Sequence, residues 1–151
     1  MTTGIRVTDP SVLGQEQRAS VQLTNAQALA LRATPITLVA APGANRAIKV
    51  ESVTIVSDAA AGVYTETADN IAIEYADGTD ILTIETTGLI DQAAIETRHQ
   101  NAPAATLTTP VANSAVRALN NGDGEWGGGN AANSISIMVV YRIIPTAKFG
   151  A

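Results

Sequence analysis

The sequence predicts an all-β protein built as an antiparallel β-sandwich, and three observations support that fold class. First, residues 134–144, SISIMVVYRII, alternate so that one parity is entirely β-branched or aromatic: Ile135, Ile137, Val139, Tyr141 and Ile143. Second, several short β-rich runs are separated by turn signals such as Pro42-Gly43 and Asp77-Gly78. Third, no helix longer than a few turns is supported. A jelly roll is the first choice of topology and a simpler Greek-key sandwich the second.

The strand expected at 134–144 organises the rest. Because side chains alternate along a strand, its apolar parity would form one continuous wall. The opposite parity begins with Ser, becomes apolar at Met138 and Val140, and returns to charge at Arg142. This pattern predicts a central strand that is buried on one face throughout and covered on the other only in its middle. Pro145 would end it, because proline cannot donate to a ladder.

Residues 1–34 differ from the rest of the chain. They are rich in Gln, Thr, Ser and Ala, and their apolar residues are sparse. Asp9-Pro10 would cap one helical turn, and Thr24-Asn25 would cap another over AQALALR. We therefore predict an N-terminal arm over 1–34, ordered mainly by what it contacts, and a β-sandwich domain over 35–151. The alternative is a flexible leader with no role.

The sandwich is expected to begin with a strand at 36–41, which Pro42-Gly43 ends. In the next strand, 46–57, Ile48 and Val50 share one parity while Val53 and Ile55 share the other. This slip predicts a β-bulge, or a strand buried on both sides near its end.

The remaining segments continue the pattern of short strands and turns. The Asp77-Gly78 turn predicts a hairpin between 71–75 and 81–86. Residues 88–100 are compatible with a short strand or one helical turn. The other expected elements, in order, are a loop at 58–70, an edge strand between Pro103 and Pro110, a strand at 114–119 and a Gly/Asn loop at 120–133.

Composition bears on partners. Charged residues make up 15% of the chain, below the roughly 25% usual for soluble domains. A chain with so few charges has much neutral surface, which is commonly buried against other copies or another protein. Cysteine is absent, so disulfides and thiolate metal sites are excluded. The sequence has no apolar run of about 18 residues and MTTGIRVTDP does not resemble a signal peptide, so no membrane partner is expected.

The charge is unevenly distributed. Residues 1–49 carry a net +3, residues 50–97 a net −10, and residues 98–151 a net +2. An acidic middle between basic ends suits head-to-tail contacts between copies, and it equally suits an ordinary solvated face. Nucleic-acid binding is disfavoured, because no basic stripe with interleaved aromatics is present.

Few residues suggest chemistry. His99 is the only histidine, so a multi-histidine metal site is excluded and no catalytic triad can be named. Asp77 with Asp80 resembles a calcium loop faintly, but a plain hairpin turn is the better interpretation. Asp123 and Glu125 form a second candidate ion or sugar site. We therefore predict no enzyme activity, no cofactor and no metal.

Three segments carry a family resemblance: LVAAPGANRAIKVESVTIV, IAIEYADGTDILTI and SAVRALNNGDGEWGGGNAANSISIMVVYRII. Together they resemble the capsid decoration, or cement, proteins of tailed bacteriophages. The resemblance implies a jelly-roll-like domain, usually trimeric, that clamps neighbouring major-capsid subunits, with an arm extending over the capsid surface. It also implies a virion protein made in the host cytoplasm, with the major capsid protein as its partner.

The candidate interface residues follow from this picture: Arg6, Val7, Val12, Leu13, Arg18 and Trp126. Trp126 is either an anchor at a partner surface or a lid that folds back on the sandwich edge. The competing function is a receptor- or glycan-binding module of a virion tail or fibre. Such a site normally needs stacking aromatics, and aromatics make up only 3% of the chain.

Overall fold

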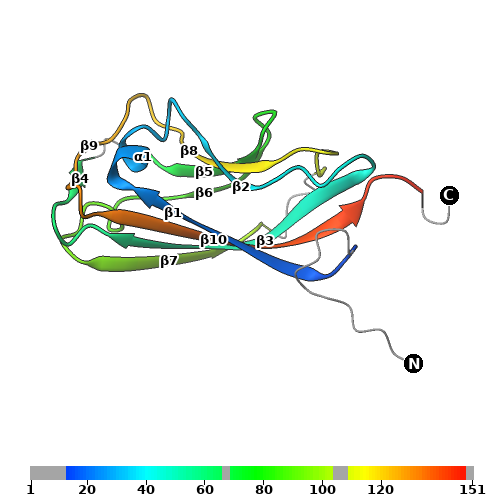
Figure 1. The fold of residues 1–151 in the computed structure, drawn as a ribbon, viewed down its shortest axis with the longest axis horizontal. Coiled ribbons are helices and arrows are strands. Elements are labelled where there is room, and N and C mark those ends of the chain that lie inside the picture. The colour runs from blue at the N-terminus through cyan, green and yellow to red at the C-terminus, as the bar shows by residue number, and fades with distance from the viewer. Residues whose placement is uncertain (1–12, 66–68, 104–108, 149–151) are drawn as a thin grey trace.

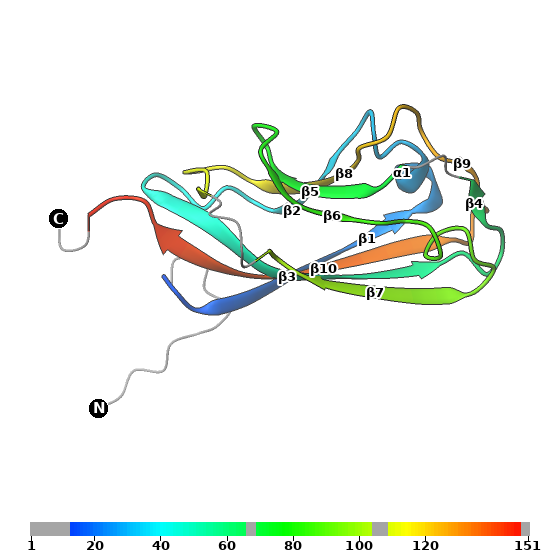
Figure 2. The ribbon, with the colours of Figure 1, turned by 180° about the vertical axis from the view of Figure 1, so that it is seen from behind.

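A computed structural model of the chain describes residues 13–65, 69–103 and 109–148. Two four-stranded antiparallel sheets pack face to face (Figures 1 and 2). Sheet A contains, in spatial order, β1 (Glu16–Thr24), β10 (Ser134–Pro145), β3 (Arg46–Asp58) and β7 (Ile95–Asn101). Sheet B contains β2 (Ile36–Val39), β8 (Val116–Asn120), β5 (Ile71–Tyr75) and β6 (Asp80–Ile84).

Two smaller elements lie at one end of the sandwich. The ladder of β4 (Tyr64–Thr65) with β9 (Gly127–Gly128) and the five-residue helix α1 (Asn25–Leu29) are both at the left of Figure 1. No helix in the described ranges is long and apolar enough to cross a membrane.

The strand pairing is that of a jelly roll. Leaving out β4 and β9, the eight remaining strands pair first with last (β1–β10), second with seventh (β2–β8), third with sixth (β3–β7) and fourth with fifth (β5–β6). The pairs β10–β3 and β8–β5 join these four ribbons into two sheets. Eight strands wound in this way form two Greek keys. The predicted antiparallel sandwich is therefore confirmed, with the first-choice topology.

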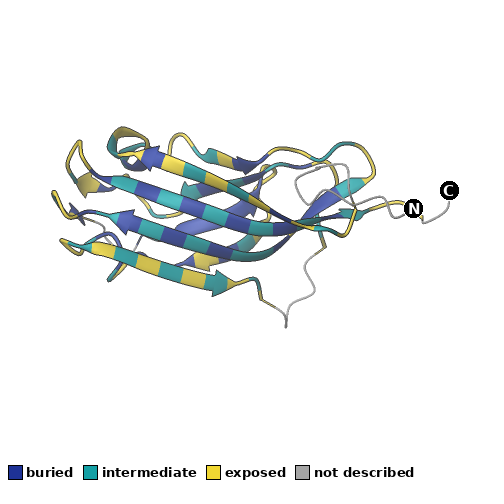
Figure 3. Cartoon of the chain, turned by 60° about the horizontal axis from the view of Figure 1, so that its bottom comes forward, coloured by how far each residue is buried: buried dark blue, intermediate teal, exposed yellow. Residues whose placement is uncertain are grey.

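Strand β10 is central in sheet A, as expected. Its apolar parity is buried at every position and faces sheet B. The opposite parity is half-buried along the whole strand, so the extra cover expected over Met138 and Val140 is wrong. These side chains are shielded only by their neighbours on β1 and β3, because no second layer of described residues lies on this face (Figure 3).

The bulge predicted in β3 is confirmed. Val140 lies opposite Ser52 and Tyr141 lies opposite Val50, so Glu51 is the extra residue. One inserted residue shifts the alternation by one position. Both apolar pairs, 48 with 50 and 53 with 55, therefore face the same core despite their opposite parity.

The interpretation of residues 1–34 as an arm is wrong for residues 16–34. Strand β1 pairs with β10 over its whole length, and Leu23, Ala28 and Leu31 are fully buried. Main-chain hydrogen bonds place this polar strand in the sandwich, although it has few apolar side chains. The Thr24 cap is confirmed, because Thr24 and Gln27 form a reciprocal capping box at the start of α1. Residues 1–12, including Asp9-Pro10, lie outside the described residues.

Most other local predictions hold. The strand at 36–41 corresponds to β2, the 71–86 hairpin to β5 and β6, and the strand at 114–119 to β8. The second half of the ambiguous segment 88–100 belongs to strand β7, which ends at Asn101. Residues 104–108, the middle of the expected edge strand between the two prolines, lie outside the described residues.

Candidate interaction surface

The outer face of sheet A carries no charged side chain over its middle. Two adjacent cross-strand rows form its middle, which we call the neutral face: Ser20, Met138, Thr54 and His99, then Gln22, Ser136, Val56 and Thr97. Figure 3 shows this sheet from outside: buried and half-buried positions alternate along the central strands β10 and β3, and half-buried and exposed positions alternate along the edge strand β7. Interface cores are depleted of charged residues, so such a face suits packing against another protein surface.

His99 lies on this face, where its ring contacts side chains of β3 and β7. Its Nδ1 is 2.8 Å from the Thr54 hydroxyl, and its Nε2 is 3.3 Å from the Asn101 side-chain oxygen. Both ring nitrogens are therefore used in polar contacts along β3 and β7. In the described ranges, no three His, Asp or Glu side chains gather closely enough to hold a metal ion.

Charges border the neutral face where β3 begins and β10 ends. Arg142 donates from Nε to Glu51 at 3.0 Å and lies 3.7 Å from Glu16. Lys49 lies 3.1 Å from Glu51, and Arg18 lies 3.6 Å from Glu16. Because these charges pair with one another, the network presents little net field to a partner. Exposed pairs of this kind contribute about 0–1 kcal/mol each.

The edge strand β7 is protected against strand addition. Arg98 points inward from it and donates to the backbone oxygens of Glu85, at 2.5 Å, and Thr87, at 3.1 Å. An inward charge on an edge strand discourages pairing with another strand. The flat face of sheet A, and not its β7 edge, is therefore the better candidate contact.

The structure places three of the six predicted interface residues. Leu13 is 44% exposed and pairs in parallel with Ile143. The Arg18 side chain is 68% exposed on the outer side of β1, beside the neutral face. Arg6, Val7 and Val12 lie outside the described residues.

The anchor interpretation of Trp126 is wrong. Its side chain is 3% exposed and packs against Tyr64, with ring centroids 6.1 Å apart and planes at 52°. Strand β9 follows Trp126 directly and pairs with β4, so the loop returns over the end of the sandwich. Gly128, with φ of 68°, makes this return possible because a side chain there would meet the Val63 carbonyl. Trp126 therefore folds back as a lid on the edge of the sandwich, which was the other interpretation of this residue.

The acidic loops use their carboxylates locally. Asp77 accepts a hydrogen bond from the Thr79 N–H at 2.9 Å, and the Thr79 backbone and side chain together hold the pKa of the Asp77 carboxyl below its ordinary value. Glu125 accepts from the N–H groups of Arg32 and Ala33 at 3.0 and 2.7 Å. These contacts explain both acids as loop-fixing groups.

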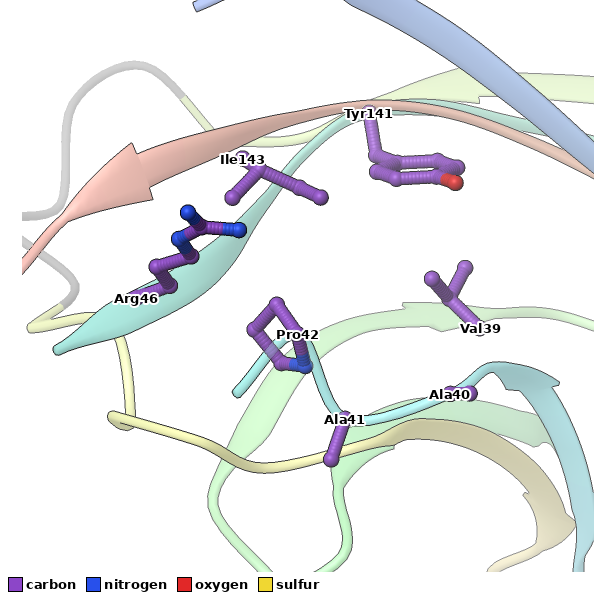
Figure 4. Close-up of a pocket in the computed structure, with 7 residues that line it drawn as sticks. All are labelled: Val39, Ala40, Ala41, Pro42, Arg46, Tyr141 and Ile143. Atoms are coloured by element: carbon purple, nitrogen blue, oxygen red, sulfur yellow. The ribbon is translucent and has the colours of Figure 1, made fainter. Parts of the chain in front are cut away.

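A pocket that the sequence did not predict lies at the opposite end from Trp126. Its volume is about 330 Å³, and it is lined mainly by apolar groups from β2, the following loop, β3 and β10: Val39, Ala40, Ala41, Pro42, Arg46, Tyr141 and Ile143 (Figure 4). The Pro42-Gly43 turn marks one wall, but its partner residues lie about a hundred positions later in the sequence. Local patterns therefore do not reveal the pocket.

Comparison with solved structures finds a distant likeness. No protein-family model matches the chain, and no curated protein matches it either. A solved structure described as the cyanophage Pam1 capsid asymmetric unit contains a chain that is similar over 95% of this chain and 94% of its own. The two are 18% identical, with a TM-score of 0.49. At that distance the likeness carries no argument about function.

Proposed function

We propose that the protein is a structural virion protein that binds the outside of a bacteriophage capsid and stabilises it by clamping neighbouring major-capsid subunits. The observation that carries this proposal is the neutral face of sheet A, in a chain with only 15% charged residues. A jelly roll hosts many functions, so the fold alone does not decide among them. The family resemblance of the sequence selects the capsid surface as the partner.

The neutral face is suited to such a contact for two physical reasons. Covering its Ser, Thr, Val and Met side chains costs less hydration free energy than covering charged side chains would, because none of them is ionised. It is also supported from beneath by buried side chains of β10 and β3, so it is preorganised and loses little entropy on binding. Arg18 lies at its rim, where a charge affects association rate and orientation more than affinity.

A matched pair of charge insertions tests this assignment. Thr97 is exposed on the neutral face, whereas Thr83 is exposed on the outer side of sheet B. We expect Thr97→Lys to weaken co-sedimentation with capsid shells lacking the protein by at least tenfold, since an unpaired charge would be buried. Thr83→Lys should bind like the unchanged protein. Equal binding by the two variants would exclude the neutral face as the contact.

The protein is further expected to form a homotrimer, because a trimer would hold several capsid subunits at once. Size exclusion coupled to light scattering measures this directly. A stable monomer at tens of micromolar would remove the oligomer and leave only the contact with the shell.

The glycan-binding alternative has no supporting surface in the described ranges. All four aromatic side chains found there are buried: Tyr64, Tyr75, Trp126 and Tyr141. Sugar rings commonly stack on exposed aromatic faces. The capsid contact is therefore the function that the geometry favours.

A further inference from the structure

One corner of sheet A, at the Trp126 end of the sandwich, presents an exposed aliphatic side chain. Ile95, the first residue of β7, is 64% exposed, more than any other large apolar side chain in the described ranges. It shares its parity with Thr97 and His99, so it continues the outer face of sheet A beyond the neutral face. Asp58, the last residue of β3, lies directly opposite Ile95 in the strand register. The corner therefore combines an aliphatic side chain with a neighbouring carboxylate.

The Asp58 carboxylate forms no ion pair with a described residue. It accepts a hydrogen bond from the Ala60 N–H at 3.3 Å, a local contact that leaves its charge uncompensated. Side chains directly opposite each other on neighbouring strands lie about 5 Å apart. A surface that covers Ile95 therefore also takes water from Asp58, which costs free energy unless a cation pairs with the carboxylate. A suitable partner must offer an apolar recess and a cation together.

The pocket at the other end of the sandwich offers both. Its volume is about 330 Å³, which is enough for one branched aliphatic side chain. Figure 4 shows the side chains of Val39 and Pro42 directed toward those of Tyr141 and Ile143, with Arg46 in the same lining. Among the described residues, no carboxylate lies within ion-pair distance of Arg46. The pocket and the corner are therefore complementary in shape and in charge.

The pocket and the corner of one chain cannot meet. Arg46 and Asp58 are the first and last residues of β3, a strand of 13 residues, so about 40 Å of extended chain separates them. They also belong to segments of opposite net charge, since residues 1–49 carry +3 and residues 50–97 carry −10. Complementary patches at opposite ends of one molecule suit a head-to-tail contact between copies, which closes into a ring or continues as a filament.

We propose that copies of this chain associate head to tail, with Ile95 of one copy inserted in the pocket of the next and Asp58 paired with Arg46. In the homotrimer proposed above, each copy then gives its corner to one neighbour and its pocket to the other. This inference rests on that proposed self-association and not on the capsid contact. The two rows of the neutral face take no part in it.

Size exclusion coupled to light scattering tests the contact on the full chain without capsid shells. The natural chain should be an oligomer of three or more copies at tens of micromolar. Ile95→Ser and Arg46→Gln should each weaken association by at least about tenfold, the scale expected when a buried aliphatic side chain or its neighbouring ion pair is lost. Two matched controls should leave association unchanged. Val63→Ser alters another exposed aliphatic side chain, and Lys49→Gln removes a cation that already pairs with Glu51.

Mixing two variants tests the head-to-tail arrangement itself. I95S/D58N retains only the pocket and R46D retains only the corner, so each alone should be a monomer. An equimolar mixture should form a dimer and nothing larger, because one corner and one pocket remain. The charge exchange R46D/D58R within one chain should restore the oligomer that R46D loses, and circular dichroism confirms that each variant is folded.

Three outcomes would overturn the proposal: a monomeric or dimeric natural chain, an oligomer that Ile95→Ser leaves intact, or variants that do not associate when mixed. The second outcome would leave the homotrimer in place and exclude only this contact. The capsid contact is tested separately, because Thr97→Lys and Thr83→Lys are compared by co-sedimentation with shells. Failure of one proposal is therefore distinguishable from failure of the other.

Discussion

The two ends of the sandwich are built differently. At one end, Trp126 and Tyr64 pack ring against ring, and the β4–β9 ladder and α1 complete the cover. At the other end, a pocket lies between β10 and the loop that follows β2, with Arg46 in its lining. Both ends are formed by segments remote in sequence, but only the first is filled by large side chains of the described residues.

This difference separates stability from binding. The indole nitrogen of Trp126 is buried and has no hydrogen-bond partner among the described residues. The unsatisfied donor is destabilising, and burial of the large apolar ring offsets this cost. The open end keeps empty apolar volume, and no carboxylate of the described residues pairs with Arg46 there. The closed end is therefore where truncation should cost most, and the open end is where filling the pocket should add most.

The largest expected effect is at the closed end. Trp126→Ala should lower the free energy of unfolding by about 3–5 kcal/mol, because it removes a buried aromatic ring and leaves a cavity. The matched truncation at the open end, Val39→Ala, should cost only about 1 kcal/mol, since that side chain borders a pocket already present. Urea titration followed by circular dichroism measures both. Equal losses would show that the two ends contribute alike.

An intermediate effect is expected at alkaline pH. Burial raises the pKa of the Tyr64 hydroxyl, and the nearby Asn133 side chain opposes this only in part. A raised pKa means that the folded state holds its proton more tightly than the unfolded state, so this stability is complete below about pH 10 and is lost as pH rises through the folded value.

Tyr64→Phe should therefore reduce the fall in stability between pH 9 and pH 11. Urea midpoints across that range, for the natural chain and the variant, provide the measurement. Parallel curves would mean that Tyr64 is not a source of the alkaline sensitivity, and Tyr141, whose pKa is also raised by burial, would be tested next.

The smallest effect is expected at the charge network beside the open end. Glu51→Gln weakens the pairs with Arg142 and Lys49, and should lower stability by less than about 1 kcal/mol because these side chains are partly exposed. The difference should shrink further in 1 M salt, where the Debye length is about 3 Å. Thermal unfolding at low and high salt checks it. A larger or salt-independent loss would point instead to the bulge that Glu51 forms.

Local patterns predicted much of the fold because they record burial directly. The alternation in β10, the parity slip at Glu51 and the cap at Thr24 each depend on a few neighbouring residues. Strand β1 was missed because it has few apolar side chains and is held by β10, more than a hundred residues away. The buried side of the Trp126 loop was equally hidden, since it depends on pairing between β9 and β4.

The position of β10 also has a consequence for synthesis. This strand lies between β1 and β3 in sheet A, so β1 cannot complete its pairing until residue 142 has left the ribosome, and β3 cannot until residue 145 has. Residues 135–141, ISIMVVY, carry no charge and favour β structure, which makes them prone to intermolecular stacking while unpaired. Contacts between such distant segments also form slowly, over milliseconds to seconds. Newly made chains therefore pass through an interval in which correct closure of sheet A competes with aggregation, and Arg142 directly after this run is placed to oppose the latter.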